Sequence, residues 1–103
     1  MQRLSPAQLS EWLADPKRAK PVLLDVREQW EFQLNHIDGS LHIPLSLIPA
    51  RLEHLDPASE MVVICHHGAR SFQAARFLEQ SGFGKLYNLE SGVDGWAKTV
   101  DPA

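Results

Sequence analysis

The sequence predicts an α/β domain built on a mostly parallel sheet, and three observations support this fold class. Short apolar runs alternate with helical patterns along the chain. The runs over 21–26 and 61–64 are apolar along most of their length rather than at alternate positions, which is typical of strands buried on both faces. The length of 103 residues suits one domain with its own core, so we expect a single domain over residues 1–103.

The first predicted helix begins at Pro6, a residue suited to the first helical position. Ser5 precedes it as the expected N-cap, and Gln8 completes a capping box. One apolar face follows at helical spacing and consists of Leu9, Trp12 and Leu13. These signals together predict a helix that packs on the core and precedes the apolar strand over 21–26.

The middle of the chain carries frequent turn signals. Residues 27–32 are compatible with a helical turn, the Asp-Gly pair at 38–39 predicts a tight turn, and Pro44 blocks the continuation of a central strand. Ser46 is then expected to cap a helix. The predicted apolar face of that helix consists of Ile48, Leu52 and Leu55.

The second half of the chain repeats the order of strand and helix. The strand over 61–64 leads through a short loop into a helix over 71–80, for which Gly82 is the expected C-terminal stop. The predicted face of that helix consists of Phe72, Ala75 and Leu78. A strand over 85–89 and a final turn or helix from 92–96 complete the expected elements.

Composition and charge argue against several classes of protein. Hydrophobic residues make up 44% of the chain and charged residues 22%, which is ordinary for a globular domain. No apolar run approaches the roughly 18 residues of a membrane span, and no apolar signal segment follows Met1. The net charge of −3 is mixed along the chain without a basic stripe, which argues against nucleic-acid binding.

The chain contains one cysteine, Cys65, which rules out an intrachain disulfide and a four-cysteine zinc site. Together with the missing signal segment, this favours the reducing cytoplasm as the location. A lone cysteine after a buried strand is either a small core residue or a reactive thiol.

The setting of Cys65 favours the reactive thiol. Cys65 is expected at the carboxyl end of a buried strand, where ligands bind in open α/β sheets. The amides of the loop and of the following helix N-terminus favour an anion there, Gly68 permits the curled backbone, and Arg70 adds a cation. These features favour a reachable thiolate that attacks an anionic substrate and a site that stabilises the developing negative charge.

His66 and His67 allow several interpretations. They are poor zinc ligands together with Cys65, because three adjacent residues cannot easily converge on one tetrahedral ion. Acid–base roles stay open, but we expect their amides to shape the loop and their rings to add partial positive charge at its rim. Ser71 either donates to the loop or caps the helix, and capping is the default interpretation.

Asp25 and Arg27 are separated by one residue at the end of the first buried strand, so their side chains should point to the same side. A pair with each other, or with Glu28 or Glu31, would brace the wall of the site. We therefore assign Asp25 and Arg27 a supporting role rather than a catalytic one.

Three sequence blocks stand out: the stretch from Leu24 to Pro44 with LDVRE, EF, HIDGS and IP, the loop CHHGARS at 65–71, and NLESGVDGW at 88–96. In this order they resemble the signatures of the rhodanese homology domain in its single-domain form, and the resemblance extends over nearly the whole chain.

The resemblance implies a five-stranded, mostly parallel sheet with helices on both faces. It also implies a sulfurtransferase of the thiosulfate:cyanide type. In such an enzyme Cys65 would take a sulfane sulfur from a small anionic donor such as thiosulfate, become a persulfide, and pass the sulfur to cyanide or a thiol. Protein-bound persulfides are a further class of partner, and no metal or organic cofactor is expected. The residues implied to bind the substrate are His66, His67, Gly68, Ala69, Arg70 and Ser71.

Two alternatives remain beside the sulfurtransferase. Related phosphatases and arsenate reductases on this fold have a loop one residue longer, whereas four residues separate Cys65 from Arg70 here, so sulfur transfer is favoured. A non-catalytic interaction module is the other alternative, and the intact cysteine and arginine argue against it. The rings of His66 and His67 with Arg70 suggest an electropositive or neutral loop, which suits a dianion such as thiosulfate.

The chain departs from the family pattern at three positions: Asn35 and Ser91 stand where glycine is common, and Ser40 where alanine is common. Asn35 is interpreted as a mild change, because asparagine tolerates left-handed backbone. Ser91 is expected near the mouth of the site, where it could alter the loop geometry. None of the three changes removes a group that the chemistry needs.

Overall fold

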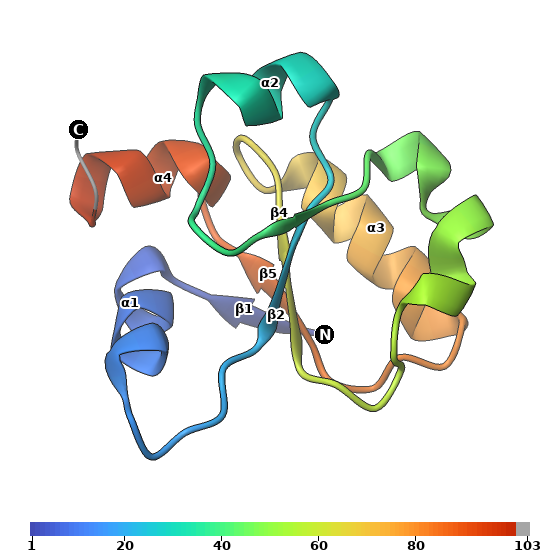
Figure 1. Cartoon of the computed structure of the whole chain (residues 1–103), viewed down its shortest axis with the longest axis horizontal. Helices are drawn as coiled ribbons and strands as arrows, with labels where there is room; N and C mark the ends of the chain where they lie inside the picture. The colour runs from blue at the N-terminus through green and yellow to red at the C-terminus, as the bar shows by residue number, and fades with distance from the viewer. Residues whose placement is uncertain (101–103) are drawn as a thin grey trace.

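The computed structural model describes residues 1–100 and contains a five-stranded sheet with the strand order β1-β5-β4-β2-β3 (Figure 1). The strands are β1 (Gln2–Leu4), β2 (Val22–Asp25), β3 (Leu41–His42), β4 (Met61–Ile64) and β5 (Leu86–Leu89). Every neighbouring pair in the sheet is parallel. The predicted five-stranded parallel sheet is therefore confirmed, and its parallel character is complete.

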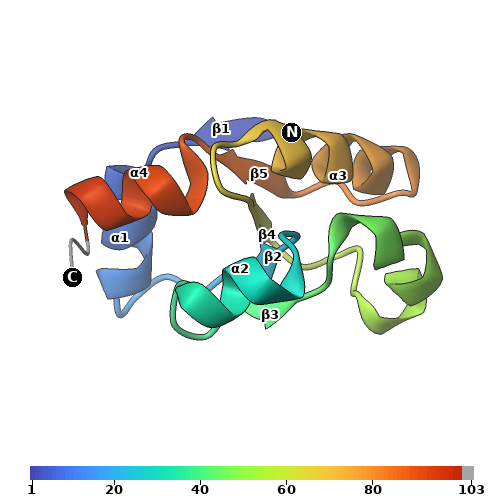
Figure 2. The ribbon, with the colours of Figure 1, turned by 90° about the horizontal axis from the view of Figure 1, so that it is seen from above.

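Helices cover both faces of this sheet, as predicted. They are α1 (Pro6–Ala14), α2 (Gln29–Leu34), α3 (Ala69–Gln80) and α4 (Gly92–Thr99), with two 3₁₀ helices, η1 (Leu45–Leu47) and η2 (Pro49–His54). Figure 2 shows α1 and α4 on one side of the sheet and α3 with the two 3₁₀ helices on the other. The short helix α2 contributes no buried residue and lies over the carboxyl ends of the strands (Figure 1). No helix within residues 1–100 is long and apolar enough to cross a membrane.

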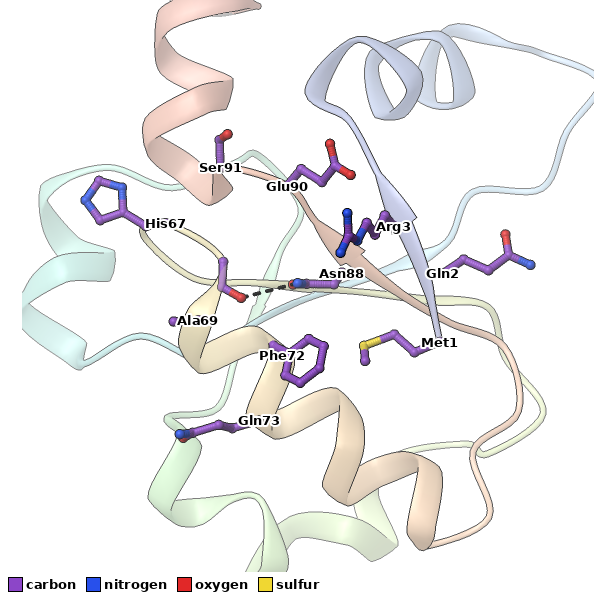
Figure 3. A pocket seen from close by; sticks show the side chains of 11 residues that line it. Met1, Gln2, Arg3, His67, Ala69, Phe72, Gln73, Asn88, Glu90 and Ser91 are labelled. Carbon is purple, nitrogen blue, oxygen red and sulfur yellow. Dashed lines mark hydrogen bonds between the residues drawn. The ribbon is translucent and has the colours of Figure 1, made fainter.

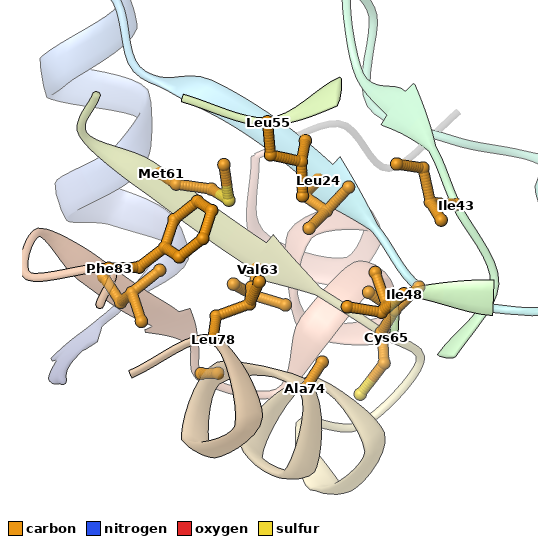
Figure 4. Close-up of a cluster of buried hydrophobic side chains, with 13 residues drawn as sticks. Leu24, Ile43, Ile48, Leu55, Met61, Val63, Cys65, Ala74, Leu78 and Phe83 are labelled. Carbon is orange, nitrogen blue, oxygen red and sulfur yellow. The ribbon is translucent and has the colours of Figure 1, made fainter. Parts of the chain in front are cut away.

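Strand β4 separates two hydrophobic clusters, because its side chains alternate between the two faces of the sheet and all four are buried. Val62 and Ile64 join the cluster under α1 and α4. Met61 and Val63 join the cluster under α3, to which Cys65 also belongs (Figure 4). Burial on both faces explains why this strand is apolar at every position.

The predicted helix signals at two helix ends are confirmed. At the start of α1, Ser5 Oγ accepts a hydrogen bond from the Gln8 amide at 3.1 Å, and Gln8 Oε1 accepts one from the Ser5 amide at 2.8 Å. At the end of α3, Gly82 has a φ of +99°, and the Phe83 amide donates to the Leu78 carbonyl at 3.0 Å. The second pattern is the αL glycine stop expected at this position.

The prediction that Ser46 caps a regular helix is wrong. Ser46 lies inside η1, its side chain is exposed, and two short 3₁₀ helices replace the expected α-helix. Pro49 explains the interruption, because a proline has no amide hydrogen to continue the hydrogen-bond ladder. Of the predicted apolar face, Ile48 and Leu55 are buried and Leu52 packs partly buried against the same cluster.

The predicted position of Phe72 on the buried face of α3 is also wrong, because Phe72 is 46% exposed whereas Ala75 and Leu78 are buried. Six residues of α-helix turn the side chain by about 240°, so Phe72 and Leu78 point in directions about 120° apart. Phe72 therefore lies at the edge of the helix that faces solvent.

Candidate active site

Cys65 follows β4 directly, and α3 begins four residues later at Ala69. The three intervening residues form the loop at the carboxyl end of the sheet, as predicted, but the helix begins two residues before the predicted range of 71–80. Gly68 is the N-cap of α3 and has a φ of +109°, in the left-handed region that favours glycine. This conformation accompanies the hydrogen bond from the Gly68 amide back to the cysteine.

Two groups face the sulfur atom of Cys65. The Gly68 amide donates a hydrogen bond to Sγ at 2.9 Å, and Ser71 Oγ lies 3.3 Å from the same atom. Cys65 itself is 1% exposed, so the sulfur lies beneath the loop rather than open to solvent. The Gly68 amide donates to the sulfur as expected. The sulfur is not accessible to solvent in this conformation, although the sequence predicted a reachable thiol. A sulfur-donor molecule therefore reaches Sγ only after a local movement.

Ser71 lies in the first turn of α3 and is fully buried. Its hydroxyl contacts Asn88 Oδ1 and donates to the Gly68 carbonyl at 3.1 Å, in addition to its contact with the sulfur. Because Gly68 is the N-cap and no side chain caps this helix, the default interpretation of Ser71 as a cap is wrong. Ser71 instead connects the sulfur to the loop and to β5.

Asn88 is a contact residue that the sequence interpretation did not single out, although it begins the third family-like block. Its Nδ2 donates to the Gly68 carbonyl at 3.2 Å, as Figure 3 shows. Asn88 belongs to β5, which lies next to β4 in the sheet. The neighbouring strand therefore supports the loop from the side, a relation that depends on strand order.

Arg70 is bound by a carboxylate from α2. Its Nη1 and Nη2 donate to the two oxygens of Glu31 at 2.6 and 2.8 Å. The hydrogen bond from Arg70 holds the pKa of Glu31 at about 2, well below its usual value, and the bond with Glu31 in turn raises the pKa of Arg70. The cation that the sequence places near the sulfur is thus present but already paired.

The backbone of His66 and Cys65 is held by the start of α4. The Val93 amide donates to the Cys65 carbonyl at 2.8 Å, and the Asp94 amide donates to the His66 carbonyl at 3.1 Å. Backbone amides at the start of α4, rather than side chains, thus hold the carbonyls of Cys65 and His66. The third block of the family-like pattern is therefore part of the site.

The two histidine side chains lie at the rim. His67 is exposed, and its Nδ1 is 3.8 Å from Asp94 Oδ2. The His66 and His67 rings contact each other at 4.1 Å between centroids, in an edge-to-face arrangement. Within residues 1–100 no group of three or more His, Cys, Asp or Glu side chains is arranged to hold a metal ion.

Asp25 and Arg27 pair with each other, which is one of the predicted pairings. Arg27 Nε and Nη2 both donate to the Asp25 carboxylate, at 3.0 and 2.9 Å, and both residues are almost completely buried. Arg27 Nη2 also donates to the Asn35 carbonyl at 2.5 Å. The pair therefore joins the end of β2 to the end of α2, and α2 carries the Glu31 that binds Arg70.

Asn35 and Ser91, which replace glycines common in the family pattern, differ in backbone conformation. Asn35 has a φ of −165°, so its backbone is extended and the left-handed tolerance of asparagine is not used. Ser91 has a φ of +60°, in the left-handed region where the family usually has glycine. The backbone at Ser91 thus keeps a glycine-like conformation and leads into α4 beside the loop.

A pocket of about 630 Å³ lies on the outer side of the loop (Figure 3). His67, Gly68 and Ala69 form one wall, and β1 with the end of β5 forms another. Cys65 does not line this pocket, because Gly68 lies between the pocket and the sulfur.

The sequence of residues 5–99 matches the family described as "Rhodanese-like domain". The chain belongs to the rhodanese-like family. The match extends from the N-cap of α1 to the end of α4, so it includes α2, α3, α4 and β5, which supply the contacts described above.

Two similar proteins are sulfurtransferases. A "Sulfurtransferase" from Allochromatium vinosum is 37% identical over 90 residues, which are 87% of this chain and 82% of the relative. The "Thiosulfate sulfurtransferase GlpE" of Ectopseudomonas mendocina is 33% identical over 97 residues, 94% of this chain and 85% of the relative. These likenesses support sulfur transfer as the general activity of this chain.

The solved structure of a rhodanese-related protein from Thermoplasma volcanium has the same fold. Its TM-score is 0.86 at 30% identity, over 97% of this chain and 94% of that protein. The predicted rhodanese-like architecture is therefore confirmed.

Proposed function

We propose that this protein transfers a sulfane sulfur through a persulfide on Cys65. The observation that supports this best is the hydrogen bond from the Gly68 amide to Sγ at the N-terminus of α3. A charge-assisted bond of this kind is stronger to a thiolate than to a thiol, and the helix N-terminus adds a favourable field. Cys65 is therefore the nucleophile. Its substrate-binding surface consists of the loop over 66–68 and the first residues of α3, Ala69, Arg70 and Ser71.

In the first half-reaction the Cys65 thiolate attacks the outer sulfur of the donor. With thiosulfate, an S–S bond forms to Cys65, the S–S bond within thiosulfate breaks, and sulfite leaves with the electron pair. In the second half-reaction the acceptor attacks the outer sulfur of the persulfide. Cyanide then leaves as thiocyanate and Cys65 returns as thiolate, so the cycle needs no metal and no organic cofactor.

The enclosure of the site suits the intermediate. Cys65 is 1% exposed and the Gly68 amide donates a hydrogen bond to its sulfur, so a persulfide here is shielded from bulk water and still stabilised. We include thiols and protein-bound persulfides among its partners. We also propose the reducing cytoplasm as its location, because a single free cysteine must stay reduced to react.

The alternatives have weaker support. The four-residue spacing between Cys65 and Arg70 is shorter by one than the loop of the phosphatases and arsenate reductases that share this fold. A purely interacting module has no use for an amide aimed at a cysteine sulfur.

Exposure to thiosulfate is expected to add the mass of one sulfur atom to the intact protein, and cyanide should then remove it as thiocyanate. Cys65→Ser and Cys65→Ala should abolish both the adduct and thiocyanate formation, because the chain has no second cysteine. Intact-mass spectrometry and a thiocyanate assay measure the two steps.

Continued thiocyanate formation by either variant would exclude Cys65 as the carrier. Hydrolysis of an aryl phosphate faster than sulfur transfer would favour the phosphatase alternative. A folded wild-type protein that never gains sulfur from thiosulfate or from a thiol persulfide would favour the interaction module.

A further inference from the structure

The ion pair between Arg70 and Glu31 joins two elements 39 residues apart in sequence. The guanidinium makes a two-point contact with the carboxylate, at 2.6 and 2.8 Å, and the side chain of Glu31 is only 12% exposed. The Glu28 amide also donates to Glu31 Oε1 at 3.0 Å, within the capping box of α2. Two donors thus hold Glu31 in place and ionised throughout the neutral pH range.

Several charges around the loop are paired. Arg70 is neutralised by Glu31, and the buried Arg27 is neutralised by Asp25. Beyond the rim, Asp94 pairs with Lys98 at 3.1 Å and faces His67 at 3.8 Å. Because Arg70 is paired, the group that donates to the sulfur is the Gly68 amide at the α3 N-terminus rather than this guanidinium.

We propose that Glu31 sets the selectivity of the site between sulfur donors of different charge, because it neutralises Arg70. This inference rests on the proposed function. A dianionic donor such as thiosulfate gains little from a paired arginine and is repelled by the Glu31 carboxylate. A donor of lower charge loses less through the same pairing, since Coulomb energy scales with the charge of the donor. Glu31 is thus a specificity-determining residue that lowers the preference of the site for the dianion.

The inference is tested with two donors that share the same reacting group. Thiosulfate carries two negative charges, and methanethiosulfonate carries one. In each case the thiolate takes the outer sulfur, and the leaving group is sulfite or methanesulfinate. The second-order rate constant for sulfur uptake by Cys65 is measured for each donor in single-turnover experiments.

Glu31→Gln removes the negative charge and keeps a side chain that can accept from Arg70 and complete the capping box. We expect the thiosulfate rate constant to rise roughly three- to tenfold, and that for methanethiosulfonate by about the square root of that factor. Any effect of the variant on the thiolate itself acts on both donors equally, so the ratio of the two rate constants isolates donor charge. Added salt should shrink the gain for thiosulfate most.

Two further variants control the measurement. Glu11→Gln, on the exposed face of α1, makes the same change in net charge away from the loop and should leave the ratio unchanged. The double variant Glu31→Gln with Arg70→Met should lose the gain for thiosulfate, because the released cation is then absent.

An equal change for both donors in Glu31→Gln, or the same ratio in Glu31→Gln and Glu11→Gln, would overturn the inference. A loss of rate with both donors would indicate that Glu31 has a structural role only. These outcomes differ from failure of the proposed function, in which wild-type Cys65 gains no sulfur from either donor.

Discussion

At the scale of single residues, Gly92 shows how closely α4 approaches the loop. A Cβ at this position would lie 2.1 Å from the Cys65 carbonyl oxygen and 2.6 Å from that of His66. Its φ of +53° is also in the left-handed region. The glycine therefore allows the α4 N-terminus to reach the two carbonyls that begin the loop.

Gly92→Ala is expected to cost about 2–5 kcal/mol of unfolding free energy, through backbone strain and overpacking. It should also slow sulfur uptake, since the carbonyls of Cys65 and His66 must move. Gly84→Ala is the matched control, because a Cβ there meets nothing within 4 Å and should change stability by less than about 1 kcal/mol. Urea denaturation compares the two, and equal losses would contradict this account.

At the scale of elements, the start of α1 shows which local signals are reliable. The capping box at Ser5 and Gln8 is complete within four residues, and it forms as the sequence predicts. Ser46 is also a serine that precedes apolar residues, as Ser5 is. It caps no helix, however, because Pro49 divides the segment. A cap is therefore predictable only where the residues behind it can continue the helix.

Ser5→Ala should lower the unfolding free energy by about 1 kcal/mol, because the Gln8 amide loses its acceptor. Ser46→Ala should stay within about 0.5 kcal/mol of the wild type, as expected for an exposed side chain. Chemical denaturation of both variants measures the difference. A loss at Ser46 as large as that at Ser5 would show that Ser46 has a contact that the fold does not reveal.

At the scale of the whole molecule, β4 is the shared wall of two hydrophobic clusters. Leu9 of α1 belongs to one cluster and Leu78 of α3 to the other, and both are completely buried. Since every β4 side chain is buried in one cluster or the other, loss of either cluster exposes the strand that precedes Cys65. The two faces should therefore unfold together.

Leu9→Ala and Leu78→Ala should each cost about 2–5 kcal/mol of unfolding free energy. Tryptophan emission reports mainly on the α1 and α4 face, through Trp12 and Trp96. In both variants its loss should occur at the same urea concentration as the loss of far-UV dichroism. A tryptophan transition in Leu9→Ala at lower urea than the far-UV transition would show that the two faces unfold independently.

The residues alone were sufficient for the features that depend on near neighbours in sequence. The two central strands β2 and β4, the capping box of α1, the glycine stop of α3 and the position of Cys65 before a helix N-terminus all follow from patterns a few residues long. Local hydrogen bonds and alternation of side chains decide such features, so no distant partner has to be known.

Only the tertiary structure decided the features that depend on distant partners. The edge strands β1 and β3 are three and two residues long and exist through pairing with β5 and β2. Likewise, Asn88 reaches Ser71 and Gly68 because β5 lies beside β4, and Glu31 reaches Arg70 because the fold brings α2 to the start of α3. Short strands and single side-chain contacts gain their free energy from groups that are distant in sequence. The sequence therefore named Gly68, Arg70 and Ser71 beside Cys65, but not the contacts that Glu31 and Asn88 make with them.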